Sequence, residues 1–504
     1  MSLGELFDAQ RLENPMAKAV ADLTFHLTYR ELGDRVDHVA AGLGRLGVGT
    51  NDRAALILPD QIEAVILFWA LQKVGAIVIP INPQWAPGQI TYCLQDAQPT
   101  VLITQGGVIG RDPAGGRPYT AHITLRDSPG TVSYGDLQHS RIDNARYTAL
   151  RQESDVAVIL YTSGTSGHPK GVPRSHQTVV SAARDHVVNH GYQGGERVLG
   201  AMPLAHTMGL HLMVASVLCH GCYVACRDAD PEAVFELIAK EQITALYALP
   251  SLYYTLMGSW RHDPEDVASV TKLGYAGIPM SDEVLHSCLE YFHPQKFINH
   301  YGSTEVFTHS IYDVRGGKPA CVGRASPRHP VKIAANGETF QEAAVEEIGE
   351  IMVAPNASAA FAGYWHQPAL TADAVRGGWY HSGDLGYRDG DGDIFLVGRK
   401  DDLIISAGEH IVPQSIEAIL LSHPHVAEVV VTGEPDARWG QRVVAYVVPT
   451  ITTLSAYDLD CFCKDQPGLS STVRPRQYVF VRHIPKSTTG KVLRRVLGNM
   501  EGHV

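Results

Sequence analysis

The chain has 504 residues, of which 45% are hydrophobic and 19% are charged, an ordinary balance for a globular protein in water. This length exceeds what one hydrophobic core usually holds, so two or more domains are expected. Lys and Arg number 41 and Asp and Glu number 53, and the resulting formal charge of −12 argues against a nucleic-acid-binding surface.

Several features of the sequence bear on the cellular location of the protein. No uninterrupted apolar run approaches the roughly 20 residues that span a bilayer. The first residues, Met1-Ser-Leu-Gly-Glu-Leu-Phe-Asp, lack the basic and apolar regions of a secretory signal. The eight cysteines show no paired spacing, which is typical of a reducing compartment. We therefore expect a cytoplasmic enzyme without a membrane partner. The sequence does not report the oligomeric state, and we allow for a homodimer.

The first clear element is a helix that opens at residues 27–32, with Thr28 as the N-cap and Glu31 completing a capping box. The helix ends in Gly42-Leu43-Gly44-Arg45-Leu46-Gly47, which matches the letters of the dinucleotide fingerprint G-x-G-x-x-G. That fingerprint must follow a strand and open a helix, whereas here it closes a helix. We do not predict a dinucleotide site.

Strands and helices then alternate, which predicts parallel sheets covered by helices. Strands are expected at 54–59, 76–81, 101–104, 156–161 and 197–201, and helices at 61–74 and 177–190. A further helix and strand set is expected between 210 and 250.

The strand at 156–161 runs into the stretch Thr162-Ser163-Gly164-Thr165-Ser166-Gly167-His168-Pro169-Lys170-Gly171. Glycine allows consecutive N–H groups to face one anion, the hydroxyls add donors, and Lys170 adds positive charge. This pattern predicts a loop that holds the phosphates of a nucleotide, although its spacing is not that of the Walker motif. The alternative, an exposed Gly/Ser linker, is disfavoured by the strand directly before it.

Two stretches are rich in metal-ligating residue types but lack the residue spacing of a metal site. In Cys219-His220-Gly221-Cys222-Tyr223-Val224-Ala225-Cys226 the alternation is that of a buried strand, and no second ligand pair with zinc spacing follows. In Asp389-Gly390-Asp391-Gly392-Asp393 the sixth and twelfth positions of a calcium loop hold Ile394 and Lys400. We predict a strand and a hairpin turn, respectively.

The composition changes at Gly398-Arg399-Lys400-Asp401-Asp402, a short charged junction that suits a hinge. We expect a large domain over residues 1–399 and a small α+β domain over residues 400–504. The small domain has predicted helices at 415–421 and 458–465 and predicted strands at 426–432, 443–448 and 478–481.

Four separated stretches together resemble one family, the adenylate-forming enzymes, which include acyl-CoA synthetases, luciferases and peptide-synthetase adenylation domains. They are Tyr161–Gly171, Tyr301-Gly302-Ser303-Thr304-Glu305, Tyr380-His381-Ser382-Gly383-Asp384 with Gly398–Asp401, and Pro485-Lys486-Ser487-Thr488-Thr489-Gly490-Lys491. The order and spread of the four make the match specific. The layout looks most similar to bacterial benzoate- and chlorobenzoate-type CoA ligases.

The resemblance implies an α/β fold: a large N-terminal domain of parallel-rich, helix-covered sheets with a β-barrel-like part, and a small mobile C-terminal domain. It also implies a reaction in two halves. A carboxylate attacks the α-phosphorus of ATP to give an acyl-adenylate and pyrophosphate, and the thiol of coenzyme A then displaces AMP to give a thioester. The implied cofactors are ATP, Mg²⁺ and coenzyme A.

The resemblance also assigns the nucleotide-binding residues. Lys170 and the segment Thr162, Ser163, Gly164, Thr165 and Ser166 are implied to hold the β- and γ-phosphates. Thr304 is implied to donate to the α-phosphate and Glu305 to bind Mg²⁺, for which a carboxylate oxygen is a suitable ligand. Asp384 is implied to accept from the ribose hydroxyls, and Arg399 belongs to the same cofactor-binding set. Gly277, Ile278, Pro279 and Tyr301 are implied to surround the adenine.

The small domain carries the remaining implied roles. Lys491 matches the lysine that neutralises the charge developing between carboxylate and α-phosphate, and we assign it as catalytic. Asp401 matches the residue about which the small domain turns between the two halves of the reaction. Gly408 is implied to line the pantetheine tunnel, and Trp439, Arg474 and Arg476 are implied contacts for the nucleotide of coenzyme A.

The acyl pocket should be lined by residues near the adenylate. The expected set is His206, Met208, Tyr247, Leu249, Gly277, His300, Val306 and Phe307. His206 matches a position that gates the pocket in relatives and is counted with the catalytic residues, although a plain core histidine is the alternative. The bulky rings favour a flat acid of the benzoate or furoate type.

Other functions stay open at this point. Short- or medium-chain fatty acids and alicyclic acids are alternative substrates, and a carrier protein is an alternative acceptor to coenzyme A. A non-catalytic nucleotide sensor on the same fold is disfavoured because Lys491, Glu305 and Asp384 are all present. An oxygenase of the luciferase type would need a specialised substrate that nothing in the sequence indicates.

Overall fold

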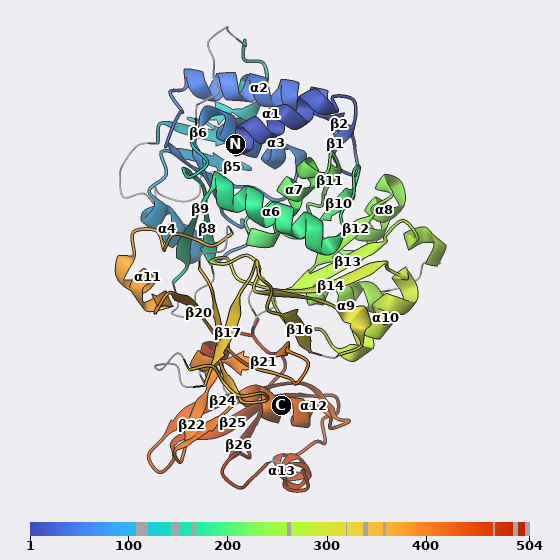
Figure 1. Cartoon of the computed structure of the whole chain (residues 1–504), viewed down its shortest axis with the longest axis vertical. Helices are drawn as coiled ribbons and strands as arrows, with labels where there is room; N and C mark the ends of the chain where they lie inside the picture. Colours follow the sequence, from blue (N-terminus) through green and yellow to red (C-terminus); the bar gives the residue numbers. More distant parts are fainter. Residues whose placement is uncertain are drawn as a thin grey trace. The chain divides into compact units, whose positions relative to one another are not determined.

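The structure of the protein is a computed structural model that describes residues 1–106, 119–142, 151–162, 168–259, 264–318, 320–335, 341–355, 359–466, 469–486 and 492–498. The chain divides into two compact units, whose elements are labelled in Figure 1. The first unit comprises Met1–Pro319, Ser326–Pro330 and Ala354–Gly378. The second unit comprises Ala320–Ala325, Val331–Val353 and Trp379–Val504.

The first sheet of the first unit holds the strand that leads into the predicted phosphate loop. Its strands are β3 (Arg53–Ile57), β4 (Ile77–Pro80), β5 (Val101–Thr104), β6 (Ala121–Thr124), β7 (Val132–Ser133), β8 (Val156–Thr162) and β9 (Lys170–Ser175). They are arranged as β7-β6-β5-β3-β4-β8-β9. All neighbours are parallel except β8 and β9, which form an antiparallel hairpin. The buried, near-continuous apolar runs of β4 and β5 are typical of parallel strands covered on both faces.

The second sheet of the first unit is also mostly parallel. Its strands are β1 (Lys18–Ala21), β2 (His26–Thr28), β10 (Arg197–Gly200), β11 (Cys222–Ala225), β12 (Ala245–Ala248), β13 (Lys272–Ala276), β14 (Lys296–Tyr301) and β15 (Ser310–Asp313). They are arranged as β15-β14-β13-β12-β10-β11-β1-β2, and only the two edge strands are antiparallel to their neighbours. The carboxyl ends of β12, β13 and β14 therefore meet at one edge of the sheet, where several predicted site residues lie.

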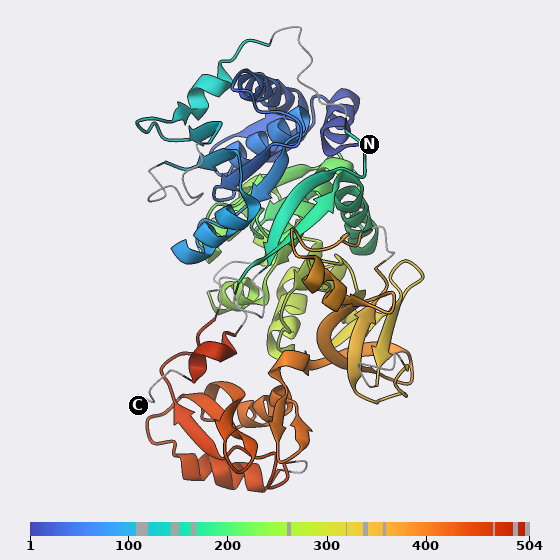
Figure 2. The same cartoon turned by 90° about the vertical axis from the view of Figure 1, so that its left-hand side faces the viewer.

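Helices cover both sheets. They are α1 (Leu3–Glu13), α2 (Tyr29–Arg45), α3 (Ile62–Val74), α4 (Pro87–Ala97), α5 (Tyr134–Gln138), α6 (His176–His190), α7 (Thr207–Leu218), α8 (Pro231–Glu241), α9 (Pro250–Gly258), α10 (Asp282–Phe292) and α11 (Pro368–Ala374), with 3₁₀ turns η1 (Pro264–Val267) and η2 (Val314–Gly316). In Figures 1 and 2, α1 and α2 pack against α3, and α6 lies against α7. Since α3 and α7 are apolar on all sides, both are buried almost throughout, inside one core that joins the two sheets.

Local signals explain the start of α2. The Thr28 side chain accepts from the backbone N–H of Glu31, and the Glu31 carboxylate accepts from the backbone N–H of Thr28 at 2.8 Å, which is a complete capping box. The glycine-rich stretch 42–47 lies at the end of this helix, as the sequence predicts. It therefore has the wrong context for a dinucleotide site.

The second unit contains two further sheets. One is arranged as β16-β21-β20-β18-β17 and the other as β23-β22-β25-β24 with β26 beside β25. The strands are β16 (Cys321–Arg324), β17 (Val331–Ala334), β18 (Gly349–Val353), β20 (Trp379–Arg388), β21 (Asp393–Arg399), β22 (Ile404–Ser406), β23 (Glu409–Ile411), β24 (Val426–Asp436), β25 (Gly440–Pro449) and β26 (Gln477–Phe480). The helices are α12 (Pro413–Leu421), α13 (Ala456–Lys464) and α14 (Arg494–Leu497), and η3 (Lys400–Asp402) is a 3₁₀ turn.

Both stretches with metal-like letters have the predicted local structure. Cys222 lies in the buried strand β11, and all eight cysteines are free thiols. The Asp389 carboxylate accepts from the backbone N–H groups of Asp391 and Asp393 at 3.0 and 2.9 Å. These bonds close the hairpin turn between β20 and β21, with Gly392 in the left-handed region at φ +85°.

The predicted fold class is confirmed: the chain is a mixed α/β protein with parallel-rich sheets and a separate C-terminal part. The strand β9 and the helix α4 are absent from the sequence prediction. The domain boundary at 399/400 and the mobility of the small domain stay predictions. Within the part of the chain that the structure describes, no helix combines the length and the apolar character that crossing a bilayer requires.

Candidate active site

The predicted phosphate loop connects the two strands of a hairpin in the first unit. In the β8–β9 pair Thr162 lies opposite Lys170 and Tyr161 lies opposite Gly171, so Thr162 and Lys170 form the base of the loop. Both side chains are half-buried. Ser163, Gly164, Thr165 and Ser166 lie outside the described residues. The antiparallel pairing places the lysine and the threonine on the same end of the hairpin, where both can face one polyphosphate.

Helix α4 supports this hairpin, and the sequence analysis did not identify it. The Tyr161 hydroxyl donates to the Asp96 carboxylate at 2.6 Å, and the Tyr92 ring stacks on His168 with centroids 4.7 Å apart. Burial, followed by the hydrogen bond to Asp96, raises the pKa of Tyr161, so its hydroxyl remains a donor. Pro87 at the first position of α4 was the available signal for this helix.

Arg174 is a second residue that sequence reasoning missed. It lies on β9, four residues after Lys170, and its side chain is fully buried. Its guanidinium donates to the carbonyl of Thr304 at 2.8 Å and to the carbonyl of Ala359 at 2.5 Å. Burial lowers its pKa to about 10 even though Glu305 opposes the shift, so the group stays charged at neutral pH. Arg174 therefore fixes the turn that presents Thr304 and Glu305.

That turn follows β14 and is built from the Tyr301–Glu305 motif. The backbone N–H of Ser303 donates to the carbonyl of Val306, and the Ser303 hydroxyl accepts from the backbone N–H of Val306, both at 3.0 Å. A Cβ atom on Gly302 would lie 1.9 Å from the carbonyl oxygen of Phe307, so no larger residue fits there. The half-buried Thr304 and the buried Glu305 are held by these main-chain contacts.

Glu305 is linked to the phosphate hairpin through Tyr364. The Tyr364 hydroxyl donates to Oε1 of Glu305 at 2.7 Å, and Nζ of Lys170 lies 5.3 Å from the centroid of the Tyr364 ring. Two main-chain hydrogen bonds attach the segment around Tyr364 to the Glu305 turn and to β9. Phe361 N–H donates to the Glu305 carbonyl, and Trp365 N–H donates to the Gly171 carbonyl.

This arrangement fits Mg²⁺. A carboxylate oxygen is the donor that the ion prefers, and ligating carboxylates are usually oriented by a hydrogen bond of the kind that Tyr364 supplies. Glu305 would hold the ion, and the ion would neutralise charge on the phosphates.

The Tyr364→Phe variant tests this link, because it keeps the ring beside Lys170 and removes only the hydroxyl. We expect the Mg²⁺ concentration needed for half-maximal pyrophosphate release to rise about tenfold, the usual effect of removing a partner that orients a metal ligand. Glu305→Gln should raise it further. Magnesium titrations of pyrophosphate release would measure both effects. An unchanged titration in Tyr364→Phe would contradict the orienting role.

The predicted acyl-pocket residues lie mainly at the carboxyl ends of β12, β13 and β14. Tyr247, His300 and Phe307 are buried, with ring centroids 6.5 Å apart for Tyr247 and His300 and 4.8 Å apart for His300 and Phe307. Gly277 follows β13 at φ +92°, and a Cβ atom there would lie 3.6 Å from the Leu249 side chain. The structure therefore brings Tyr247, His300 and Phe307 together, and it places Leu249 beside Gly277.

The remaining predicted residues of this region differ in how deeply they are buried. Ile278 is half-buried and Pro279 is exposed, directly after Gly277, and Tyr301 is buried at the end of β14. Met208 and Val306 are buried, and Val306 pairs with Ala360 in an isolated bridge.

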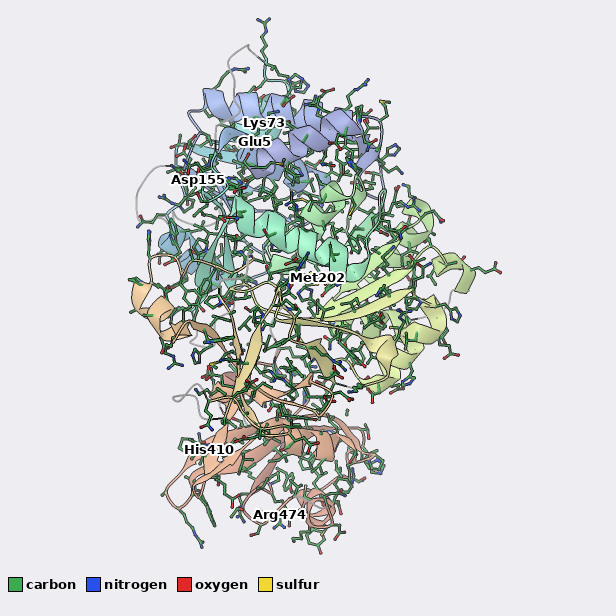
Figure 3. The ribbon with its side chains drawn as sticks, viewed as in Figure 1. Glu5, Lys73, Asp155, Met202, His410 and Arg474 are labelled. Carbon is green, nitrogen blue, oxygen red and sulfur yellow. The ribbon has the colours of Figure 1, made fainter. Side chains whose placement is uncertain are left out.

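His206 lies at the start of α7 and acts as its N-cap. Its Nδ1 atom accepts from the backbone N–H of Met208 at 3.2 Å, and the side chain is half-buried. The loop before it contains Met202, which is labelled in Figure 3 and lies in the core. Asp60, at the carboxyl end of β3, accepts from the backbone N–H of Leu204 at 2.9 Å. The carboxyl of Asp60 thus holds the loop that carries His206.

Asp60 should make the stability of the protein depend on pH. Burial raises its pKa to about 8, against about 3.9 in an unfolded chain. Between these values the folded state keeps a proton that the unfolded state has lost, so the contribution of Asp60 to the free energy of unfolding should fall as the pH rises from about 4 to about 8.

We expect Asp60→Asn, which keeps an oxygen for Leu204, to remove this fall and to be more stable than the parent by a few kcal/mol at pH 8. Urea unfolding at pH 5, 7 and 9 would measure it. Parallel pH profiles for the two proteins would contradict the assignment.

Asp384 and Arg399 belong to the second unit. They lie opposite each other on β20 and β21, and the Arg399 guanidinium donates to Oδ1 of Asp384 at 2.5 Å. Gly383, directly before Asp384 within β20, has φ +72°, a value in the left-handed region that glycine adopts readily. An ionised carboxylate has about four acceptor positions, so the pair with Arg399 leaves capacity for ribose hydroxyls.

The predicted contacts for coenzyme A are partly brought together in the second unit. Gly408 and Ala407 have φ values of +84° and +52°, as a two-residue hairpin between β22 and β23 requires. Ala407 N–H donates to the carbonyl of Trp439 at 2.9 Å, so this hairpin and the Trp439 turn are neighbours. The guanidinium carbons of Arg438 and Arg476 each lie 4.7 Å from the Trp439 ring centroid.

Arg474 takes a different position from its predicted partners. It forms a 2.8 Å ion pair with Asp460 of α13, beside which it is labelled in Figure 3. Arg438, which the sequence analysis did not single out, lies instead against Trp439. Asp401 is exposed in η3, and Lys491 lies outside the described residues.

Comparisons with known proteins bear on this arrangement of residues. Residues 7–365 match the family model of the AMP-binding enzymes, and residues 415–491 match the model of the AMP-binding enzyme C-terminal domain. The two matched ranges contain the hairpin of Lys170, the Thr304–Glu305 turn, Trp439 and Lys491.

Three similar proteins cover nearly the whole chain. A 4-chlorobenzoate–CoA ligase of an Arthrobacter species is 30% identical, with 97% of this chain and 93% of that protein covered. A long-chain-fatty-acid–CoA ligase of Mycobacterium tuberculosis is 28% identical, with 94% and 92% covered. Among solved structures, the O-succinylbenzoate–CoA synthetase of Bacillus subtilis in complex with ATP and magnesium has a TM-score of 0.84 at 25% identity, with 98% and 99% covered.

These findings confirm the predicted enzyme class, an AMP-forming acid–thiol ligase, together with ATP, Mg²⁺ and coenzyme A as its cofactors. The site residues assigned above stay predictions. From the family models and the similarity to CoA ligases over its whole length, the chain belongs to the family of AMP-binding enzymes.

Proposed function

We propose that this ligase activates a small aromatic or heteroaromatic acid of the benzoate or furoate type. The observation that supports this choice is the buried group of Tyr247, His300 and Phe307, with Leu249 beside Gly277. Rigid rings enclose a short, flat volume more readily than a long alkyl chain, and binding sites of this kind are mostly apolar.

Each of the predicted site residues has its own role in the first half-reaction. A carboxylate oxygen of the acid bonds to the α-phosphorus as the bond to the β-phosphate breaks, and pyrophosphate leaves with that electron pair. Lys170 and Thr162 would hold the β- and γ-phosphates, Thr304 would donate to the α-phosphate, and Glu305 would hold Mg²⁺. Lys491 would neutralise the charge that builds up between the two reactants.

The second half-reaction uses the second unit. The thiol sulfur bonds to the acyl carbon, the bond to AMP breaks, and the thiol proton is released. Gly408 would border the pantetheine arm, and the cations Arg438 and Arg476 beside Trp439 would attract the phosphates of coenzyme A.

A pyrophosphate-release screen with and without coenzyme A tests the proposal. We expect benzoate or 2-furoate to exceed cyclohexanecarboxylate and hexanoate in kcat/KM by about tenfold or more, the scale on which apolar pockets discriminate. Coenzyme A should convert a single turnover into steady release of AMP. A preference for the aliphatic or alicyclic acids would reject the proposed substrate. Slow turnover unchanged by coenzyme A would favour a carrier-protein acceptor.

The hinge at Asp401 gives a separate prediction. Asp401→Pro fixes φ at this exposed position and should trap one arrangement of the two parts. We expect thioester formation to fall about tenfold or more while pyrophosphate release from ATP and acid changes less than threefold, because only the second half-reaction needs the turn. Single-turnover assays of each half would measure the two rates. Unchanged thioester formation would argue against a hinge at this residue.

We also propose that the protein is cytoplasmic, and we allow for a homodimer. Sedimentation of the purified protein would measure its oligomeric state.

A further inference from the structure

Three buried histidines meet between α6 and β14 in the first unit. His186 and His190 are four residues apart on α6, so they lie on one face of the helix, and His300 lies on β14. Their exposed fractions are 0%, 2% and 2%. One ring nitrogen from each residue lies within 4.8 Å of the others. None of the roles proposed above uses His186 or His190.

The hydrogen bonds of this cluster are incomplete in a specific way. Nδ1 of His190 contacts the carbonyl of His186, and Nε2 of His300 contacts the carbonyl of Phe307, both at 3.0 Å. Among the described residues, Nε2 of His190, Nδ1 of His300 and both nitrogens of His186 have no hydrogen-bond partner. A buried polar atom without a partner costs about 1–3 kcal/mol, so the cluster requires an explanation.

The contacts that are made determine what the other nitrogens can do. A ring nitrogen facing a carbonyl must carry the proton, so in a neutral ring the opposite nitrogen has a free lone pair. Nε2 of His190 and Nδ1 of His300 are therefore lone-pair donors. A histidine that binds a metal ion usually donates its other ring N–H to a backbone carbonyl, which is the arrangement of both residues.

The protonation state agrees with this geometry. Burial lowers the pKa of all three imidazoles, that of His300 to about 4. His190 and His300 lower the pKa of His186 further, and His300 does the same for His190. Lys296 lowers the pKa of His190, whereas Asp185 opposes the shift on His300. The rings are neutral at pH 7, and neutral imidazole is the metal-binding form.

We propose that His186, His190 and His300 bind one divalent transition-metal ion, for which Zn²⁺ is the best match to three neutral nitrogen ligands. Two histidines one helical turn apart are a known zinc-binding spacing, and a third from a neighbouring strand completes a three-nitrogen set. The fourth position of a tetrahedral ion would take a small ligand such as water. The inference shares His300 with the proposed acyl pocket, but it does not depend on which acid binds there.

Binding requires a defined local movement. Zinc–nitrogen distances of about 2.0–2.1 Å in a tetrahedral site correspond to nitrogens about 3.3 Å apart, so the present separation must shrink. The His186 ring now lies parallel to the His190 ring, with centroids 3.7 Å apart, and must turn for its lone pair to face the same point. Because neither nitrogen of His186 has a partner in the part of the chain that the structure describes, this turn breaks no hydrogen bond there.

The ion would join α6 to β14. His300 directly precedes Tyr301, the first residue of the motif that presents Thr304 and Glu305. A metal ion bound at this point would therefore stabilise the strand end from which the adenylate-binding turn begins.

Metal analysis of the full-length protein tests the inference. The protein would be purified without a polyhistidine tag, treated with a chelator, incubated with Zn²⁺ and desalted. We expect about one equivalent of zinc in the parent and roughly a tenth or less in His186→Gln and His190→Gln. His176→Gln is the matched control, because His176 is a buried residue of the same helix whose Nε2 also lacks a partner among the residues described. That variant should retain the zinc.

Two measurements on the parent keep the test independent of how well the variants fold. Cobalt(II) in place of zinc should give the visible absorption of a tetrahedral nitrogen site, and zinc should raise the melting temperature. Less than about a tenth of an equivalent in the parent, or equal zinc in the parent and both cluster variants, would overturn the proposal. The first outcome would assign the unpartnered nitrogens to water.

Discussion

Replacing Lys491 with alanine should almost abolish formation of the acyl-adenylate while leaving thioester formation from supplied acyl-adenylate largely intact. The reason is that negative charge builds up between carboxylate and α-phosphate only in the first half-reaction. A positioned cation at such a point commonly contributes a few kcal/mol, or about 10²–10³ in rate. Pyrophosphate release would measure the first half, and conversion of synthetic acyl-adenylate with coenzyme A would measure the second.

Lys486→Ala is the matched control for this experiment. Lys486 lies five residues earlier in the same motif, is exposed, and pairs with Glu428. Loss of this outer ion pair should cost about 1 kcal/mol of stability at most, with little effect on either half-reaction. Equal losses in both halves for Lys491→Ala would reject the assigned role, since a residue needed only for adenylation cannot slow the transfer to coenzyme A.

The phosphate loop has a narrower role in this scheme than its composition alone suggests. Lys170 and Thr162 would hold the leaving pyrophosphate, and Tyr364 connects Lys170 with Glu305. None of these residues would act on the thioester step. The hairpin is therefore expected to be necessary for the first half-reaction and dispensable for the second.

The strands and helices with strong local signals could be predicted from the sequence. The capping box of Thr28 and Glu31, the apolar run of β8 and the helical period of α6 depend on neighbours within a few residues. The same holds for the turn of Asp389, whose carboxylate bonds to its own loop. At these positions the local sequence preferences and the tertiary structure favour the same conformation, so the elements could be predicted from the sequence.

The residues that hold the site in place could not be predicted in the same way. Arg174 binds main-chain carbonyls of Thr304 and Ala359, and a carbonyl group is present at every position, so neither partner has a sequence signature. The contact of Tyr161 with Asp96 depends on α4, whose apolar pattern is short. The histidine cluster likewise forms only when α6 packs against β14.

Arg174→Met should destabilise the protein strongly. The methionine fills part of the space but leaves the carbonyls of Thr304 and Ala359 buried without a donor. The arginine is fully buried, and loss of such a group typically costs about 3–5 kcal/mol. We expect this loss in urea unfolding at pH 7, together with a fall of about 10²-fold in pyrophosphate release, because small displacements of positioning groups have effects of that size.

A second measurement separates positioning from stability alone. If Arg174 acts by holding the Thr304–Glu305 turn, Arg174→Met should raise the Mg²⁺ requirement of pyrophosphate release and spare the conversion of supplied acyl-adenylate. Arg174→Lys, which keeps the charge but cannot span two carbonyls, should recover part of the rate. Arg184→Met, an exposed arginine on α6, should stay within about 0.5 kcal/mol of the parent. Equal loss of both half-reactions at unchanged Mg²⁺ dependence would reduce Arg174 to a structural residue, because a defect confined to the turn must appear in the metal-dependent step first.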